Sequence, residues 1–227
     1  MSDVKQQLLD AALNHVAFDG WGDATFEAAA QDAGIAPDAA RLACPRGGVD
    51  LAIAYHRRGD ALMLARYARE DLSALRYSEK VCALLRFRLE AVSDKEAVRR
   101  GTTLFTLPHL AGDGAKLIWG TTDAIWNALG DTSTDSNWYS KRATLSAVYS
   151  STVLFWLGDN SEGHADTWAF LERRIDDVMR FEKVKAQANN SAILKPLLAG
   201  PKWALGLLKA PSVTPPNDLP GHWSEPT

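Results

Sequence analysis

The sequence has few of the residues that build metal centres, disulfide frameworks or membrane spans. It contains two cysteines, Cys44 and Cys82, which lie far apart and outside any Cys-x-x-Cys pair, as is typical of a reducing compartment. No apolar run approaches the roughly 18 residues that a membrane-spanning helix needs. The first residues lack a basic stretch followed by an apolar core, so we expect no secretory signal there. These absences favour a soluble or peripheral protein of the cytoplasm.

Candidate catalytic groups are equally sparse. The five histidines are scattered, no Glu-x-x-His pair is present to build a di-iron site, and the glycines form no phosphate-binding loop. No two histidines lie at the spacing of helical metal ligands. The adjacent Asp176 and Asp177 are expected to lie on a solvated helix surface rather than to form an acid–base pair. We therefore expect no metal, no cofactor and no enzymatic activity.

What the sequence does contain is apolar residues at helical spacing. Residues of the types AVILMFWYC make up 46% of the chain and charged residues 23%, which is enough apolar surface for a core. The apolar positions between Leu9 and Val16 follow a helical stripe, and Gly20 is expected to end that helix. Thr25 is expected to cap a second short helix, and Pro37 to lie in the first turn of a third.

The same periodicity continues along most of the chain. Further helices are expected over residues 49–70, 79–91, 95–107, 113–129, 145–156 and 168–178, and no alternating strand pattern of useful length is present. The predicted fold class is therefore all-α. We divide the chain into a degenerate helix-turn-helix unit (1–48), a helical lipid-binding and dimerisation domain (49–188), an amphipathic segment (189–210) and a flexible proline-rich tail (211–227).

The N-terminal unit carries a first resemblance. Residues 17–21 (Ala-Phe-Asp-Gly-Trp), Thr25 and residues 28–35 resemble the DNA-binding unit of the TetR (tetracycline repressor-like) family. Residues 1–50, however, contain three basic and eight acidic residues, whereas a repressor must neutralise several phosphates. Repressors of that family usually place Thr, Tyr and His in the recognition helix, where this chain has Ala39, Arg41 and Ala43. We therefore expect a repressor-like fold that does not bind DNA.

A more specific resemblance lies further along the chain. Its residues are Leu107-Pro108-His109, then residues 123–126, the long run 130–142 with Ser-Thr-Asp-x-Asn-Trp-Tyr, and residues 166–174. Together they resemble the coenzyme Q (ubiquinone) biosynthesis accessory family. The resemblance implies a TetR-like fold, a bound lipid and assistance to the di-iron hydroxylase that acts on demethoxyubiquinone. It also implies a homodimer.

The resemblance further implies a surface that contacts this hydroxylase. The implied contact residues are Asp123, Ile125, Trp126, Trp138, Tyr139 and Arg142. Exposed aromatic side chains with a polar edge are frequent anchors of protein interfaces. The alternative is that Trp126 and Trp138 close the core between two helices, and that Thr134 or Asp135 merely caps the helix that follows.

A lipid cavity requires apolar walls in excess of what helix packing consumes. The segment from Leu145 to Trp156 is apolar over more than one helical stripe, and residues of earlier helices could face it. The candidate lipid-binding residues are Leu85, Leu104, Phe105, Trp119, Leu145, Val148, Tyr149, Thr152, Val153 and Trp156. Alternatively, these residues form an ordinary core or a dimer interface, because spacing alone does not separate these cases.

The segment 191–209 is apolar and basic without an acidic residue. Its candidate membrane-contacting residues are Ile193, Leu194, Lys195, Leu197, Leu198, Lys202, Trp203, Leu207, Leu208 and Lys209. The three lysines recur every seven residues and so share one helical face, as in helices that lie in the headgroup plane. Pro196 and Pro201 indicate a kinked helix. The alternative is docking on the protein itself or on a second subunit.

Three functions follow from these features. The first is a lipid-binding accessory protein on the inner face of the membrane, which presents an isoprenoid quinone intermediate to demethoxyubiquinone hydroxylase. The second is a ligand-sensing repressor of the TetR type, which requires salt-dependent binding to promoter DNA. The third is a helical scaffold without a ligand. The matched segments favour the first function.

Overall fold

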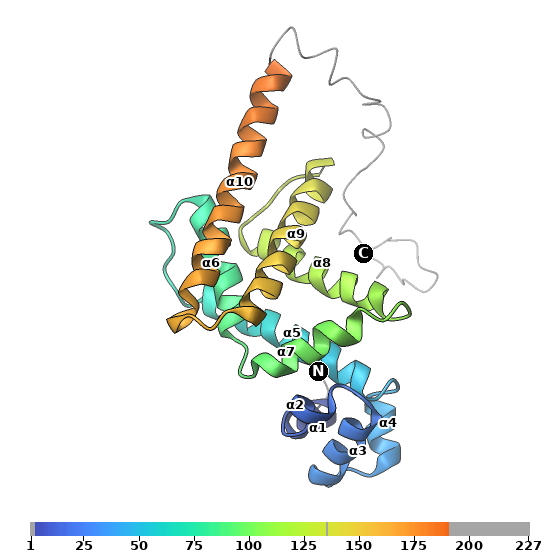
Figure 1. Cartoon of the computed structure of the whole chain (residues 1–227). Helices are drawn as coiled ribbons and strands as arrows, with labels where there is room; N and C mark the ends of the chain where they lie inside the picture. Colours follow the sequence, from blue (N-terminus) through green and yellow to red (C-terminus); the bar gives the residue numbers. More distant parts are fainter. Residues whose placement is uncertain (1–2, 135, 191–227) are drawn as a thin grey trace, which may run out of the picture.

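The computed structural model describes residues 3–134 and 136–190 of the 227-residue chain (Figure 1). All regular structure in this part of the chain is helical, which confirms the all-α prediction. The amphipathic segment predicted over 189–210 falls almost wholly outside the described residues, and all of its candidate membrane contacts do. So do the proline-rich tail and Asp135, the proposed helix cap. Within the described residues, no helix is both long and apolar enough to cross a membrane.

The N-terminal unit consists of four short helices. These are α1 (Asp3–Ala12), α2 (Val16–Asp19), α3 (Asp23–Asp32) and α4 (Pro37–Ala43), which form a separate lobe at the bottom of Figure 1. Leu8, Leu9, Val16 and Phe26 are buried in its core, together with alanines of α3 and α4. Small side chains let these short helices approach closely, and the same core includes Leu51, Ala52, Ala54 and Ala97 from further along the chain.

Two details of this unit differ from the sequence prediction. The first helix does not run on to Gly20, because the chain turns at residues 13–15 between α1 and α2. His15 in this turn lies with Nε2 at 2.7 Å from Oδ2 of Asp32, which fixes the turn to the end of α3. Thr25 is not a helix cap: it is buried in the first turn of α3, and its hydroxyl donates to the carbonyl of Gly20 at 2.6 Å. Pro37 begins α4 as predicted.

The second unit is a bundle of longer helices. They are α5 (Gly48–Tyr67), α6 (Tyr77–Glu90), α7 (Lys95–Phe105), α8 (Ala111–Ala128), α9 (Ser136–Gly158) and α10 (Ala165–Asn190), with a short 3₁₀ turn at Glu162–His164. Helix α5 leads from the N-terminal unit into the bundle, where it packs against α6 and α8 (Figure 1). The core of this bundle contains Leu84, Leu85, Ile125 and Leu171 among others. The C-terminal part of α10 projects beyond the rest of the body.

One buried carboxylate holds the corner between α9 and α10. Asp159 follows α9, and its Oδ2 accepts bonds from the backbone and the hydroxyl of Thr167, at 3.0 and 2.5 Å. Its Oδ1 accepts from the backbone N–H of Ser161 at 2.8 Å. These bonds hold the pKa of Asp159 well below its ordinary value. The turn between α9 and α10 is therefore fixed by its own aspartate.

Candidate functional site

A cavity of about 640 Å³ lies between α5, α6, α7, α8 and α9. Its walls are mostly apolar, with Leu62 from α5, Leu89 from α6, Ile118 from α8 and Val153 from α9. Trp21 of the N-terminal unit closes one side, since its indole N–H donates to the carbonyl of Ala97 in α7 at 2.9 Å. The volume falls within the range of roughly 300–1,000 Å³ that is usual for small-molecule sites.

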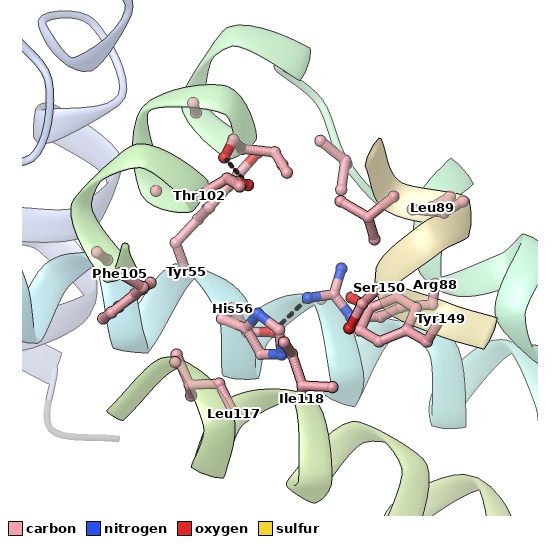
Figure 2. Close-up of a pocket in the computed structure, with 18 of the residues that line it drawn as sticks. Tyr55, His56, Arg88, Leu89, Thr102, Phe105, Leu117, Ile118, Tyr149 and Ser150 are labelled. Carbon is pink, nitrogen blue, oxygen red and sulfur yellow. Dashed lines mark hydrogen bonds between the residues drawn. The ribbon is translucent and has the colours of Figure 1, made fainter. Parts of the chain in front are cut away.

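A close helix crossing shapes another wall. A Cβ at Gly114 of α8 would lie 2.8 Å from the Cβ of Phe105 in α7, closer than real Cβ atoms come. Glycine at this position therefore lets the ring of Phe105 lie at the edge of the cavity, where Figure 2 shows it. The predicted lipid-binding role of Phe105 is thus compatible with its place in the structure.

The other predicted lipid-binding residues divide into two groups. Phe105, Tyr149 and Val153 line the cavity. The remaining seven do not line it. Four of them belong to the bundle core, namely Leu85, Leu145, Val148 and Trp156. Leu104 packs against the core of the N-terminal unit, Thr152 donates to the carbonyl of Val148 in its own helix, and Trp119 lies in an aromatic cluster. The reason is that α9 is apolar on several stripes, and only one of them faces the cavity.

Sequence reasoning missed the polar end of this cavity. The side chains of His56, Asp60, Arg88 and Thr121, from α5, α6 and α8, form a hydrogen-bonded group that we call the polar corner. His56 and Arg88 line the cavity (Figure 2), and Asp60 and Thr121 lie behind them as their hydrogen-bond partners. Nε of Arg88 donates to Oδ1 of Asp60 at 2.6 Å, and its Nη2 donates to the carbonyl of His56 at 3.0 Å. The hydroxyl of Thr121 donates to Oδ1 of Asp60 at 2.9 Å and lies 2.8 Å from Nε2 of His56.

The charge state of the polar corner follows from its burial. Burial and the guanidinium of Arg88 lower the pKa of His56 to about 3, so the imidazole is neutral at physiological pH. Burial raises the pKa of Asp60, and Arg88 beside it counteracts that rise. Burial opposes the charge of Arg88, but Tyr149 and Asp60 raise its pKa overall. The corner therefore contains one paired cation and anion and a neutral imidazole.

A second surface gathers three aromatic rings, Trp119 of α8 and Trp138 and Tyr139 of α9, which we call the aromatic patch. The ring centroids of Trp138 and Tyr139 are 4.7 Å apart, and each lies within 6.4 Å of the Trp119 ring. All three residues are half-buried. Trp126 lies apart from them and stacks on Tyr77 with centroids 5.9 Å apart.

The predicted partner-contact residues do not all lie on the surface. Ile125 is buried in the bundle core, and the side chain of Arg142 is 1% exposed. Arg142 donates to Asp123 at 2.6 Å and to Asp131 at 3.1 Å, and its guanidinium lies 3.9 Å from the centroid of the Trp138 ring. Arg142 thus supports Trp138 of the aromatic patch from beneath, while Asp123, Trp126, Trp138 and Tyr139 are partly exposed.

The two arginines of the N-terminal unit are engaged within the protein. Arg46 pairs with Asp50 at 3.0 Å and with Asp113 at 2.7 Å. Arg41 lies 3.6 Å from Asp23 and over the ring of Phe26. Together with the acidic composition of residues 1–50, these pairs leave the face of α4 without an excess of positive charge.

The described residues contain no group of three or more His, Cys, Asp or Glu side chains placed to bind a metal ion. The thiol of Cys82 lies near Glu172 and Asp176, and burial together with these carboxylates raises its pKa to about 12. Burial likewise raises the pKa of the Cys44 thiol. Both thiols are therefore protonated at neutral pH and are poor nucleophiles.

The chain is similar to a family of known function. Residues 111–182, which include α8, α9 and the first part of α10, match the family model described as COQ9. The mitochondrial ubiquinone biosynthesis protein COQ9 of Homo sapiens is 28% identical over 197 residues, which are 83% of this chain and 61% of the human protein. COQ9-A of Xenopus laevis is 31% identical over 205 residues, 86% of this chain and 64% of that protein. The chain spans about three-fifths of the length of these relatives.

The fold also has a solved counterpart. A TetR transcriptional regulator from Nitrosomonas europaea superposes with a TM-score of 0.64 at 21% sequence identity, and covers 77% of this chain and 97% of the regulator. The predicted TetR-like helical fold is thereby confirmed. The resemblance to the coenzyme Q accessory family is confirmed as well, by the matched model and the relatives.

Proposed function

We propose that this chain, whose residues 111–182 match the COQ9 family model, is a lipid-binding accessory protein of ubiquinone biosynthesis. The protein takes up an isoprenoid quinone intermediate at a membrane surface and presents it to demethoxyubiquinone hydroxylase. The observation that carries the proposal is the apolar cavity, which shares α8 and α9 with the COQ9 segment. The relatives are named as ubiquinone biosynthesis proteins.

The physical argument for a lipid is the chemistry of the walls. Burial of apolar surface contributes roughly 25 cal/mol per Å², so an isoprenoid chain that fills this volume would gain several kcal/mol. The lining residues are largely Ala, Leu, Ile, Val and aromatic residues. An inducer-sensing repressor could use a similar cavity. The arginines of the N-terminal unit, however, are paired with aspartates, and its acidic residues outnumber its basic ones, so its binding to DNA is disfavoured.

The aromatic patch supports the hydroxylase-docking part of the proposal. Half-buried Trp and Tyr side chains fixed from beneath by a charged network are the kind of rigid anchors that protein interfaces use. Docking through Asp123, Trp126, Trp138 and Tyr139 remains a prediction, as does membrane contact through residues 193–209. The homodimer is also a proposal, supported by exposed Phe155, Met179 and Phe181 on α9 and α10.

Blocking the cavity tests the lipid-binding part. Val153→Trp places an indole into the cavity from α9, whereas Ala147→Trp adds the same ring at an exposed position of α9 outside the lining. We expect native mass spectrometry to detect co-purified lipid on the unmodified chain and on Ala147→Trp, with at least several-fold less on Val153→Trp. Equal lipid on both variants, or none on the unmodified chain, would count against the proposal.

A second experiment tests docking alone. The double change Trp138→Ala and Tyr139→Ala should weaken binding to purified demethoxyubiquinone hydroxylase by tenfold or more in an equilibrium titration, as expected for loss of interface anchors worth about 2 kcal/mol. Lipid retention should be unchanged, because the patch does not line the cavity. Phe18→Ala, which removes an aromatic ring that is 83% exposed on the N-terminal unit, is the matched control. Unaltered affinity of the double variant would refute this part.

A further inference from the structure

We propose that the polar corner makes the cavity selective for lipids with an uncharged polar head and against lipids with an ionised head, a selectivity that rests on the proposed lipid-binding function. The charges around the cavity are paired, which disfavours an ionised head. The polar corner presents hydrogen-bonding groups, which favour an uncharged polar head.

Every arginine among the described lining residues has an aspartate beside it. Arg88 bonds to Asp60 at 2.6 Å, and its side chain is 5% exposed. Arg58 contacts Asp10 of the N-terminal unit, also at 2.6 Å. Each of the two guanidinium groups at the cavity is therefore paired with one carboxylate, and Nη2 of Arg58 is buried without a hydrogen-bond partner among the described residues.

The corner nevertheless offers hydrogen bonds. Because the hydroxyl hydrogen of Thr121 is directed to Asp60, the neutral imidazole of His56 is assigned Nε2–H as the donor to Thr121, which leaves Nδ1 as an acceptor. Arg88 uses Nε and Nη2 in the bonds described above, and Nη1 lies against Gly59, where a Cβ would come within 2.4 Å of it. Tyr149 and Ser150 add hydroxyl groups at the same end of the cavity (Figure 2).

These groups suit a hydroxyl, a phenol or a quinone carbonyl. Such a head exchanges its hydrogen bonds with water for bonds to the corner at little cost. An ionised carboxylate or phosphate loses a far larger hydration energy in a mostly apolar cavity. The Arg88 guanidinium cannot offset that loss fully, because the carboxylate of Asp60 already neutralises it and repels a second anion.

The test compares two ligands with the same chain and different heads. The isoprenoid alcohol farnesol and the corresponding acid, farnesoic acid, are offered together in equal amounts to the purified full chain at neutral pH. Bound ligand is separated, extracted and quantified by mass spectrometry. Because the readout is the ratio of two ligands on the same protein, a partly unfolded preparation lowers both amounts and leaves the ratio unchanged.

Asp60→Asn supplies the decisive variant. The asparagine keeps an oxygen that can accept a hydrogen bond from Arg88, but it removes the compensating negative charge. Arg88 then becomes an unpaired cation that attracts the carboxylate of an acid. Glu90→Gln is the matched control: it removes one carboxylate on α6, two residues from Arg88, but Glu90 pairs with Arg66 and Arg86 instead. The unmodified protein tests the preference itself even where Asp60→Asn fails to fold.

We expect the unmodified chain and Glu90→Gln to bind the alcohol in preference to the acid by about tenfold or more. Asp60→Asn should shift the ratio of bound alcohol to bound acid toward the acid by about tenfold, the change that corresponds to about 1.4 kcal/mol. Equal binding of both ligands by the unmodified chain, or an unshifted ratio in folded Asp60→Asn, overturns the selectivity and leaves lipid binding intact. Retention of neither ligand by the unmodified chain overturns the proposed function, and the selectivity with it.

Discussion

Replacing Arg142 with methionine should destabilise the bundle severely, although the substituted residue keeps an unbranched apolar stem. Arg142 joins Asp123 of α8 and Asp131 of the α8–α9 connection to α9, and it also donates to the carbonyl of Trp138 at 3.2 Å and to the side-chain oxygen of Asn127 at 3.2 Å. Its side chain is 1% exposed and that of Asp131 is 3% exposed. The substitution therefore leaves a buried carboxylate with fewer partners.

The size of the effect follows from this arrangement. Removing one partner of a buried ion pair costs about 3–5 kcal/mol. Because Lys141 still contacts Asp131 at 2.7 Å, we expect the lower end, about 3 kcal/mol. For a protein of this size that corresponds to a fall of roughly 6–12 °C in the thermal midpoint. Arg173→Met, at an exposed position of α10, is the control and should change stability by less than about 0.5 kcal/mol.

The pairing of Arg142 with Asp131 also predicts how the stability of the chain depends on pH. Burial raises the pKa of Asp131, but hydrogen bonds from Lys141, Ser133 and Arg142 outweigh it and lower the pKa to about 2, from an ordinary 3.8. A depressed carboxylate pKa contributes stability that is present above the unfolded value and is lost as pH falls through the folded one. The difference between Arg142→Met and the unmodified chain should therefore be constant above about pH 5 and shrink as pH falls toward 2.

Urea titrations followed by circular dichroism between pH 7 and pH 3 measure this difference directly. A loss below about 1 kcal/mol at neutral pH, which is about one third of the expected value, would refute the assignment of Arg142 as a buried support. A difference that grows with acidity would refute the assigned charge of Asp131.

Two further predictions concern the cavity wall and the N-terminal unit. Gly59→Ala should destabilise the chain by about 1–3 kcal/mol in the same urea titration, because the added methyl group displaces Arg88 from its pair with Asp60. Gly120→Ala, with open space around it on α8, is the control and should stabilise the chain by roughly 0.5–1 kcal/mol. If Gly59→Ala left the stability unchanged, the fixed position of Arg88 would be contradicted. In gel-shift assays against a library of genomic fragments at moderate salt, the chain should retain no fragment, because the N-terminal unit has no excess of positive charge; a sequence-specific shift would restore the repressor interpretation.

Much of the fold could be predicted from the sequence, because helical periodicity and helix-ending residues are local signals. Pro37 marked the start of α4, and Gly34, with φ of 64°, follows the end of α3 in the left-handed conformation that glycine readily adopts. The break between α1 and α2 is not predictable in this way, since the contact that holds its turn, between His15 and Asp32, joins residues 17 positions apart. Periodicity does not register such contacts.

The site was harder to predict for a related reason. Val148 and Val153 are both apolar residues of α9, yet one packs in the bundle core and the other lines the cavity. Which stripe faces the cavity depends on the angles between helices, which composition does not encode. The polar corner did leave a signal in the sequence: Arg88 stands between the apolar residues Phe87 and Leu89 of α6, and a buried arginine requires a partner. That partner, Asp60, lies 28 residues away.

The aromatic patch illustrates an intermediate case. The run from Gly130 to Arg142 points to the part of the chain that contributes Trp138 and Tyr139 to the aromatic patch, but it does not indicate the depth of each side chain. The resemblance implies a partner contact at Arg142, whereas its side chain is buried and pairs with Asp123 and Asp131. Trp119 was assigned to the cavity, whereas it packs beside Trp138. Residue type alone does not decide exposure when charged and aromatic groups can satisfy one another.

The central claim is that the cavity between α5 and α9 holds a lipid, and photochemical labelling tests it most directly. A photoreactive isoprenoid alcohol is bound to the full chain, irradiated, and its adducts are mapped by peptide mass spectrometry. The account predicts adducts on lining residues such as Leu62, Ile118 and Val153, and their loss when unlabelled farnesol competes. Adducts confined to exposed faces such as Phe181, or labelling that competitor does not reduce, would contradict it.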